Sequence, residues 1–297
     1  MAPTFTHLVM SGGGMTSLCY LGALRFLDVE GMTKKIKHIA GTSMGALFAA
    51  ALALQIPLDH LEDRVARMLD DDAAMSMPIP DVFAYVRDLG VEDPRRFVEV
   101  LRPEIDMLTF LELSKKTGVN LVICATHVAT MDAMYFSVDT TPNVLVMDAV
   151  RASIAVPWLF KPVKIGDDYF VDGGVADNLP FRVFEDIPSS AVLLFHTYPK
   201  MLHMPEHKNP SDKPISYTLC LISRFLSQLS GAAFIREKYP YYLFFDSAPL
   251  SFMPVILHND RVRINVKKGE LDESISYGYS LAFNNLRKFM QESEQTP

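Results

Sequence analysis

The sequence contains little cysteine and no closely spaced cysteine pair. Cys19, Cys124 and Cys220 are the three cysteines among 297 residues, and each lies in an apolar stretch. An odd number of widely spaced cysteines is not typical of a disulfide framework, and the absence of a CxxC motif gives no indication of a zinc site. We therefore expect buried free thiols, a reducing intracellular compartment and no bound metal.

The sequence also lacks a long hydrophobic run, a basic leader and an excess of positive charge. The most apolar helical stretch, residues 44–56, contains Gln55 and stops before Pro57, so it is shorter than the roughly 20 residues that span a bilayer. No basic segment followed by an apolar one opens the chain, and no signal peptide is predicted. We expect an intracellular protein that is soluble or attached peripherally to a membrane.

The balance of charge argues against nucleic-acid binding. Lys and Arg total 28 against 35 Asp and Glu, which gives a formal net charge of −7 at pH 7. Because proteins hold nucleic acids largely through basic side chains that neutralise phosphates, this composition does not favour such a partner. A hydrophobic content of 49% predicts a large buried core instead.

Strand-like and helix-like patterns alternate along the chain. Residues 7–10 and 36–40 have the apolar composition of buried strands, and residues 18–30 between them have helical periodicity, so a parallel βαβ unit is predicted. We expect further strands at 120–128, 133–139 and 191–198, a pair near 241–266, and a hairpin at 163–171 that turns at Gly166 and Asp167. Helices are expected at 57–72, 81–89, 94–103, 109–117 (with a Thr109–Glu112 capping box and Gly118 as its stop), 147–156, beyond a loop at 199–214, and at 271–292.

These elements predict one α/β domain over residues 1–297, with a mostly parallel central sheet and helices on both faces. The chain shows no internal repeat and no low-complexity segment. The motifs described below lie in a core of about residues 5–200. Residues 201–297 carry no motif, and the sequence assigns them no role.

Ser43 lies at the centre of GTSMG, between Gly41 and Gly45. A strand pattern precedes this motif and the apolar helix of residues 44–56 follows it. In that setting a serine typically occupies a sharp, strained elbow with its hydroxyl exposed, and the glycines give the turn room. Ser43 is thus a candidate nucleophile, and a small residue in an ordinary turn is the alternative.

Two other glycine clusters, Gly12–Gly14 and Gly173–Gly174, each follow a strand pattern. Glycines between a strand and a helix leave backbone N–H groups free to bind negative charge. A nucleotide phosphate fits poorly here, because the lysine of a phosphate-binding loop is missing and Ser17 stands where a dinucleotide fingerprint has its third glycine. The oxyanion of an acyl-transfer intermediate is the better-supported ligand for Gly12, Gly13 and Gly14.

A serine nucleophile needs a base, and Asp172 is the strongest candidate. It ends the 168–171 strand pattern and precedes two glycines that allow close approach of another backbone, and a carboxylate buried there would need a partner. A turn or capping role is the structural alternative. Histidines at strand ends, namely His127, His196 and His258, remain candidates for a Ser-His-Asp arrangement.

Four segments together resemble the patatin-like phospholipase family: GGG after the first strand, GTSMG, RASIAVPWLFKPV and DGGVADNLP. Their order matches the family's order, and the resemblance covers roughly the first 200 residues. It implies an α/β fold related to that of lipases and a lipid acyl hydrolase with a Ser-Asp dyad and no histidine. By this resemblance Ser43 is the nucleophile, Asp172 the general base and Gly12–Gly14 the oxyanion loop, supported by the motif glycines Gly41, Gly45, Gly173 and Gly174.

The resemblance implies hydrolysis of a phospholipid or another acyl-ester lipid through an acyl-serine, with no metal and no organic cofactor. The sequence departs from the family at Thr16 and Ser17, where a basic residue and a glycine are usual. An acyltransferase that uses the same acyl-serine is one alternative. A non-catalytic lipid-binding protein on the same fold is another, which the Thr16 and Ser17 departure motivates.

Two apolar segments allow a functional and a structural interpretation. Residues 74–83, with Met75, Met77, Ile79 and Phe83, could form a mobile lid or an edge that touches a membrane, or could pack on the core. Trp158, Leu159 and Phe160 could line an acyl pocket, or could pack beneath the site.

Overall fold

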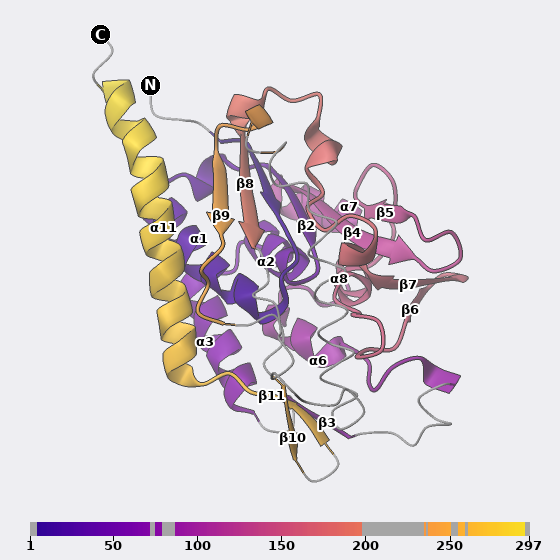
Figure 1. Ribbon diagram of the computed structural model, residues 1–297. Helices are drawn as coiled ribbons and strands as arrows, with labels where there is room; N and C mark the ends of the chain where they lie inside the picture. The colour runs from indigo at the N-terminus through magenta and orange to yellow at the C-terminus, as the bar shows by residue number, and fades with distance from the viewer. Residues whose placement is uncertain are drawn as a thin grey trace.

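The computed structural model describes residues 5–71, 75–78, 87–197, 235, 237–250, 255–258 and 261–294. An eight-stranded sheet forms its centre, in the order β6-β7-β4-β2-β1-β8-β9, with β5 paired to β4 (Figure 1). Five neighbouring strands run parallel: β1 (His7–Met10), β2 (His38–Thr42), β4 (Asn120–His127), β8 (Val192–Thr197) and β9 (Tyr242–Phe245). The other three are antiparallel: β5 (Ala133–Phe136), β6 (Val163–Ile165) and β7 (Asp168–Asp172).

Helices flank this sheet, which confirms the predicted α/β class with mostly parallel strands. The helices in the described parts of the chain are α1 (Cys19–Val29), α2 (Met44–Ala53), α3 (Leu58–Asp70), α6 (Arg95–Val98), α7 (Phe110–Thr117), α8 (Val146–Ser153) and α11 (Lys268–Glu294). None of them combines the length and the apolar character needed to cross a bilayer. A smaller antiparallel sheet contains β3 (Ser76–Pro78), β10 (Val255–His258) and β11 (Arg261–Ile264).

Two apolar clusters lie on opposite faces of the sheet, because successive side chains of a strand point in opposite directions. Leu8 and Met10 of β1 face the larger cluster, which includes side chains of α1, α2, α8 and α11. Val9 faces a smaller cluster with Phe184, which ends the 3₁₀ helix η5 (Phe181–Phe184), and Tyr239. The sheet is therefore buried on both faces, which explains the continuous apolar runs in its parallel strands.

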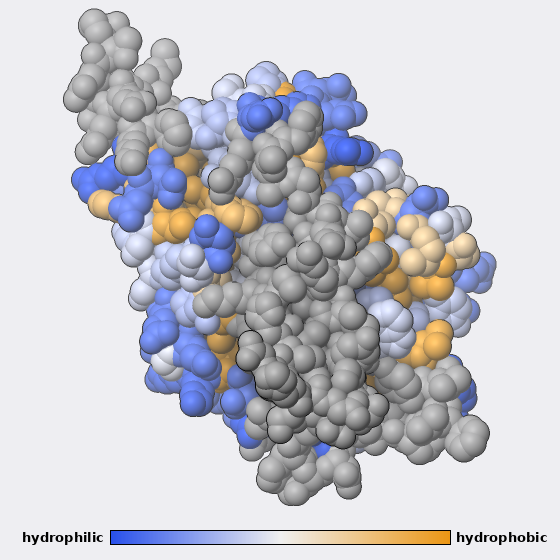
Figure 2. All heavy atoms as spheres, in the orientation of Figure 1, coloured by the Kyte–Doolittle hydropathy of each residue, from blue (hydrophilic) through white to orange (hydrophobic). Residues whose placement is uncertain are grey.

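The C-terminal helix α11 packs against α1 along one side of the molecule (Figure 1). Glycines permit the close contact, since a Cβ on Gly22 would overlap the carbonyl of Ile275 and a Cβ on Gly278 would overlap the carbonyl of Cys19. Leu286 of α11 is also fully buried. The outer surface along which α11 lies, at the left-hand edge of the molecule, is in contrast largely hydrophilic (Figure 2). With β9 at the sheet edge, the C-terminal part thus completes the large core.

Most element boundaries agree with the sequence predictions. The Thr109–Glu112 capping box is present, Gly118 ends α7 in the left-handed region at φ 69°, and the β6–β7 hairpin turns at Gly166 and Asp167. The helix expected at 94–103 is shorter, because α6 gives way to the 3₁₀ turn η3 (Glu99–Leu101). The strand pair expected near 241–266 is present as β10 and β11 in the smaller sheet, and β9 is an additional strand in this range that joins the central sheet.

Several predictions lie wholly or partly outside the described residues. They are most of the helix at 81–89, the loop at 199–214, most of the helix after it, and Cys220, Ile79 and Phe83. Cys19 and Cys124 are buried free thiols. Met75 and Met77 are also buried, which supports the packing interpretation for that part of the segment.

Candidate active site

Ser43 occupies a strained turn between β2 and α2. Its backbone φ is 53°, in the left-handed region that serine seldom adopts, and such strain typically costs about 1–3 kcal/mol. Gly41 and Gly45 make the turn possible, because a Cβ on Gly41 would lie 2.5 Å from the carbonyl oxygen of Gly45, and one on Gly45 would overlap the carbonyl of Met10. The glycines of GTSMG therefore allow β2, α2 and the end of β1 to meet around the serine.

Asp172 is the hydrogen-bond partner of Ser43. The Ser43 hydroxyl donates to Asp172 Oδ2 over 2.6 Å, and the backbone N–H of Gly174 donates to Oδ1 over 2.7 Å. The side chain of Thr126 also donates to the backbone carbonyl of Asp172. Both carboxylate oxygens are thus occupied, and the side chain is held in one orientation.

The strand register explains how residues 129 positions apart in the sequence come together. Thr42 at the end of β2 lies opposite Cys124 of β4, and the next β4 residue, Ala125, lies opposite Asp172 at the end of β7. Because β7 runs antiparallel to β4, its carboxyl end reaches back beside the end of β2. A Cβ on Gly173 would overlap the carbonyl of Cys124, so only glycine fits where β7 ends against β4.

Burial shifts the acidity of Asp172. The side chain is 1% exposed, and loss of hydration disfavours its charged form, which raises the pKa of Asp172 from 3.8 to about 6. The hydrogen bonds from Ser43 and Gly174 oppose this rise because they favour the carboxylate. A carboxyl group with this pKa is mostly ionised at neutral pH and is a stronger base than an exposed aspartate.

Ser153 holds the backbone of the serine turn. The backbone N–H of Ser43 donates to Ser153 Oγ over 2.8 Å, and the Ser153 hydroxyl donates to the carbonyl of Cys124 over 2.5 Å. Ser153 is fully buried at the end of α8. Sequence reasoning did not single out this residue, because its RASIAV segment has the pattern of an ordinary amphipathic helix.

The glycine loop after β1 approaches Ser43 closely. A Cβ on Gly12 would lie 2.9 Å from Ser43 Cβ. The Gly12 N–H already donates to the carbonyl of Asn178, and the Asn178 side chain donates to the carbonyl of Gly12. The amides of Gly13 and Gly14 have no partner among the described residues, so these two amides remain candidate donors to a ligand.

Hydroxyl groups surround Gly13. Two of them belong to Thr16 and Ser17, the positions at which the family usually has a basic residue and a glycine. The Thr16 hydroxyl donates to the carbonyl of Gly13, and a Cβ on Gly13 would lie 2.8 Å from Ser17 Oγ. Ser17 Oγ is buried and has no hydrogen-bond partner in the described structure. Thr197, at the end of β8, donates its hydroxyl to the carbonyl of Gly12. The glycine loop is thus held by neutral side chains from several elements.

The three candidate histidines lie elsewhere. The His127 ring contacts Thr130 and Asp168. The His196 ring hydrogen-bonds the Tyr242 hydroxyl on β9, and His258 belongs to the smaller sheet. In the described structure the Ser43 hydroxyl is paired with a carboxylate and not with an imidazole.

Two further expectations concern the surroundings of the site. Trp158 is 52% exposed, whereas Leu159 and Phe160 are buried, which supports packing for the latter two. Among the residues that the structure describes, no group of three or more His, Cys, Asp or Glu side chains is placed to hold a metal ion.

Comparison with known proteins assigns the fold and the motifs to one family. Residues 8–185 match the family described as patatin-like phospholipase, a span that includes the glycine loop, Ser43 and Asp172. The chain belongs to the patatin-like phospholipase family. This confirms the resemblance carried by the four sequence motifs.

Relatives in this family include proteins named as lipid hydrolases. Probable lipid hydrolase 463L of Invertebrate iridescent virus 6 is 25% identical over 222 residues, which cover 67% of this chain and 73% of that protein. Triacylglycerol lipase ptl3 of Schizosaccharomyces pombe is 31% identical over 166 residues, 52% of this chain but only 34% of the lipase. The family and these relatives support lipid hydrolase activity.

A solved structure shares the fold. VipD from Legionella pneumophila superposes with a TM-score of 0.59 at 17% sequence identity, covering 97% of this chain and 68% of that chain. At this level of identity the comparison supports the patatin-like α/β architecture alone.

Proposed function

We propose that the chain is a lipid acyl hydrolase in which Ser43 is the nucleophile and Asp172 the general base. The observation that carries this proposal is the 2.6 Å hydrogen bond from the Ser43 hydroxyl to Asp172 Oδ2 at the strained turn. A nucleophile and a base within hydrogen-bond distance, with the base oriented by a third group, is the arrangement that activates a serine. Gly174 supplies that third contact to Asp172.

Acylation begins when Ser43 Oγ attacks the carbonyl carbon of a fatty-acyl ester and its proton passes to Asp172 Oδ2. The tetrahedral oxyanion accepts hydrogen bonds from the amides of Gly13 and Gly14, which follow Gly12 in the loop that approaches Ser43 and lack other partners among the described residues. The proton on Asp172 then passes to the leaving alcohol, and the acyl group stays on Ser43.

Deacylation repeats these steps with water. Asp172 removes a proton from the water as it attacks the acyl-serine carbonyl, and returns that proton to Ser43 Oγ as the ester bond breaks. The pKa of about 6 suits both roles, because the group is mostly ionised at neutral pH yet accepts a proton more readily than an exposed aspartate. These steps require no metal or organic cofactor.

The proposed substrates are phospholipids or other acyl-ester lipids, reached in solution or at a membrane surface that the protein contacts peripherally. The printed names of the relatives include both a lipid hydrolase and a triacylglycerol lipase. An acyltransferase would use the same acyl-serine, so the two activities are separated by product analysis with and without an added alcohol acceptor.

The test is mass spectrometry of purified protein treated with a fluorophosphonate probe, beside fatty-acid release from mixed phospholipid and triacylglycerol micelles. We expect a probe adduct on Ser43 that is absent in Ser43→Ala and much reduced in Asp172→Asn, together with fatty-acid release. Ser189→Ala is a matched control, because Ser189 begins a short 3₁₀ turn next to β8, away from the dyad.

An unlabelled Ser43 in folded protein, with no fatty-acid release, would contradict the proposal and favour a lipid-binding role. Equal labelling of the unaltered protein and Asp172→Asn would remove Asp172 from the mechanism while leaving Ser43 as the nucleophile.

A further inference from the structure

A cavity lies where β2 begins and α2 ends. Ser43 lies at the opposite end of both elements. Its volume is about 340 Å³, and its lining includes Ile39 of β2, Leu52 near the end of α2, and Val119 just before β4. Ser43 lies after the last residue of β2 and before the first of α2. Because α2 has ten residues and each adds about 1.5 Å, the helix separates the cavity from the serine by about 15 Å.

The inner surface of the cavity is apolar. Ile36, Ile39, Ile56 and Val119 are buried there, and Leu52 is partly buried. A volume of 340 Å³ is near the lower end of the range of about 300–1,000 Å³ for small-molecule sites, which are mostly apolar with a few polar groups. The space thus suits one aliphatic chain better than a two-chain lipid.

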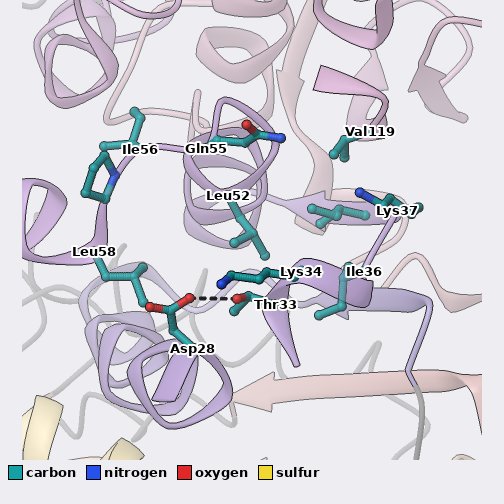
Figure 3. A pocket seen from close by; sticks show the side chains of 12 residues that line it. Asp28, Thr33, Lys34, Ile36, Lys37, Leu52, Gln55, Ile56, Leu58 and Val119 are labelled. Carbon is teal, nitrogen blue, oxygen red and sulfur yellow. Dashed lines mark hydrogen bonds between the residues drawn. The ribbon is translucent and has the colours of Figure 1, made fainter. Parts of the chain in front are cut away.

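The rim of the cavity carries two lysine ammonium groups that form no ion pair within the described part of the chain. Lys34 and Lys37 are exposed, and within the described chain neither ammonium group lies within salt-bridge distance of a carboxylate. Asp28, the acidic residue of the lining, accepts a hydrogen bond from Thr33 over 2.7 Å. Figure 3 shows Lys34 on the side of the Asp28–Thr33 pair and Lys37 on the side of Val119.

The backbone at the rim is strained. Gln55 has φ 58° where α2 ends, and the N–H of Ile56 donates to the carbonyl of Ala51, the hydrogen-bond pattern of a helix stop that normally uses glycine. Its side chain donates to the carbonyl of Thr117 at the cavity. The side chain of Gln55 is thus fixed at the rim of the cavity by its bond to Thr117.

In a second, larger cavity most of the positive charge is already paired. This cavity has a volume of about 590 Å³ and is lined by Arg64, Arg67, Arg96 and Arg102 among others. Three of these arginines already pair with acidic side chains, as Arg64 does with both oxygens of Glu104. An anion would have to displace those partners, so the lysine-rimmed cavity is the better anion site.

We propose that the lysine-rimmed cavity binds a single-chain carboxylate, a fatty-acid anion, with its chain on the apolar lining and its head group at the rim that carries Lys34 and Lys37. A lysine ammonium and a carboxylate form a charge-assisted hydrogen bond, and the chain is removed from water. Under the proposed function this ligand class is also a product of hydrolysis, but the binding itself does not depend on catalysis.

The experiment is isothermal titration of decanoate into Ser43→Ala protein, which cannot turn over an ester. We expect saturable binding of decanoate and none of acetate, which lacks the chain, or of decyltrimethylammonium, which has the opposite charge. Lys34→Met/Lys37→Met should weaken decanoate binding about tenfold, the effect of losing two partly exposed charge contacts. Lys35→Met is the matched control, because Lys35 is exposed in the same turn but does not line the cavity. This variant should bind decanoate with unchanged affinity.

A photoreactive fatty acid with a diazirine at the end of its chain locates the site independently. We expect cross-links to peptides that contain Leu52–Leu58 or Val119. The same cross-links should form in unaltered protein whose Ser43 has first been blocked with fluorophosphonate. Equal affinity of the double variant and the Lys35→Met control, or cross-links that disappear on blocking Ser43, would overturn the proposal and place any fatty acid at the catalytic site. Neither result bears on whether Ser43 hydrolyses lipids.

Discussion

Asp172 is completely buried, and both oxygens of its side chain are hydrogen-bonded. Burial raises its pKa to about 6, because the charged form loses hydration. The hydrogen bonds keep that shift from being larger. As a result, proton uptake by this one side chain should dominate the acid limb of catalysis.

The first prediction concerns the pH dependence of Ser43 reactivity. A base with a pKa of about 6 is protonated below that pH and cannot accept the serine proton, so fluorophosphonate labelling should fall about tenfold per pH unit below 6. The measurement is the second-order labelling rate from pH 4.5 to 8.5, with circular dichroism at each pH as a control for folding. A rate that keeps its neutral value down to pH 4.5 would be inconsistent with Asp172 as the base.

The second prediction concerns stability. An aspartate whose pKa is higher in the folded state lowers the free energy of unfolding above that pKa, and the penalty disappears below the unfolded value of 3.8. A rise to about 6 corresponds to about 3 kcal/mol. Asp172→Asn should therefore be more stable than the unaltered protein at pH 8 by up to about this amount, and nearly equal at pH 4. Urea unfolding at both pH values measures the difference, and a variant less stable at pH 8 would show that the burial penalty is not realised.

The third prediction concerns Asn178, which bonds both backbone groups of Gly12 and so positions the loop that carries the Gly13 and Gly14 amides. Asn178→Ala removes the side-chain half of this contact, and displacement of the loop by about 1 Å should lower the labelling rate of Ser43 by about 10²-fold. Asn285→Ala is a matched control, because its side chain bonds the Leu281 carbonyl on the exposed side of α11. Equal rates in both variants would limit Asn178 to a structural role.

At this scale the sequence predicts residues whose chemistry depends on a local pattern. Ser43 and Asp172 are recognisable because glycines accompany them at the ends of strand patterns. Ser153 and Asn178 are not, since the side chain of each hydrogen-bonds the backbone of a residue more than 100 positions away. The hydrogen bond that occupies the Gly12 amide is not predictable from the sequence either, because its acceptor, the carbonyl of Asn178, belongs to a distant loop.

Among the elements, α1 and α11 form the contact most dependent on small residues. Gly22 and Gly278 each face a backbone carbonyl of the other helix with no room for a Cβ. The helices therefore pack backbone against backbone, and the C-terminal helix is held by shape as well as by buried apolar side chains.

The fourth prediction follows from this contact. Gly278→Leu should lower the free energy of unfolding by about 3 kcal/mol or more, because the side chain must push α11 away from α1. Gly269→Ala on the same helix meets nothing within 4 Å, and should instead raise stability by about 0.5–1 kcal/mol through helix propensity. Thermal and urea unfolding of both variants test the pair. Equal effects of the two substitutions would mean that the helices do not pack this closely.

Elements with a strong local signal were predicted well, as was the parallel pair of β1 and β2, whereas pairings between distant segments were not. The capping box and stop of α7 and the β6–β7 turn depend on neighbouring residues, so the sequence specifies them. The place of β9 beside β8, and the antiparallel insertion of β7 beside β4, depend on contacts between distant segments. No local pattern contains that information.

For the molecule as a whole, the net charge of −7 should influence where it meets lipid. The fifth prediction is that hydrolysis of phosphatidylcholine vesicles in 20 mM salt falls severalfold when a third of the lipid is anionic, because like charges repel over about one Debye length. Raising the salt to 300 mM should largely abolish the difference. Faster hydrolysis of the anionic vesicles at low salt would show that a local basic surface overrides the net charge.

The order of strands in the central sheet also determines when the candidate site can exist. β1 lies between β2 and β8. Asp172, the proposed base, and Asn178, whose side chain bonds the Gly12 carbonyl, lie far along the chain from Ser43. A chain growing on the ribosome therefore carries its serine long before it carries the groups that would activate it. Under the proposed mechanism, the protein would stay inert towards the cell's lipids during synthesis until Asp172 and Asn178 have emerged.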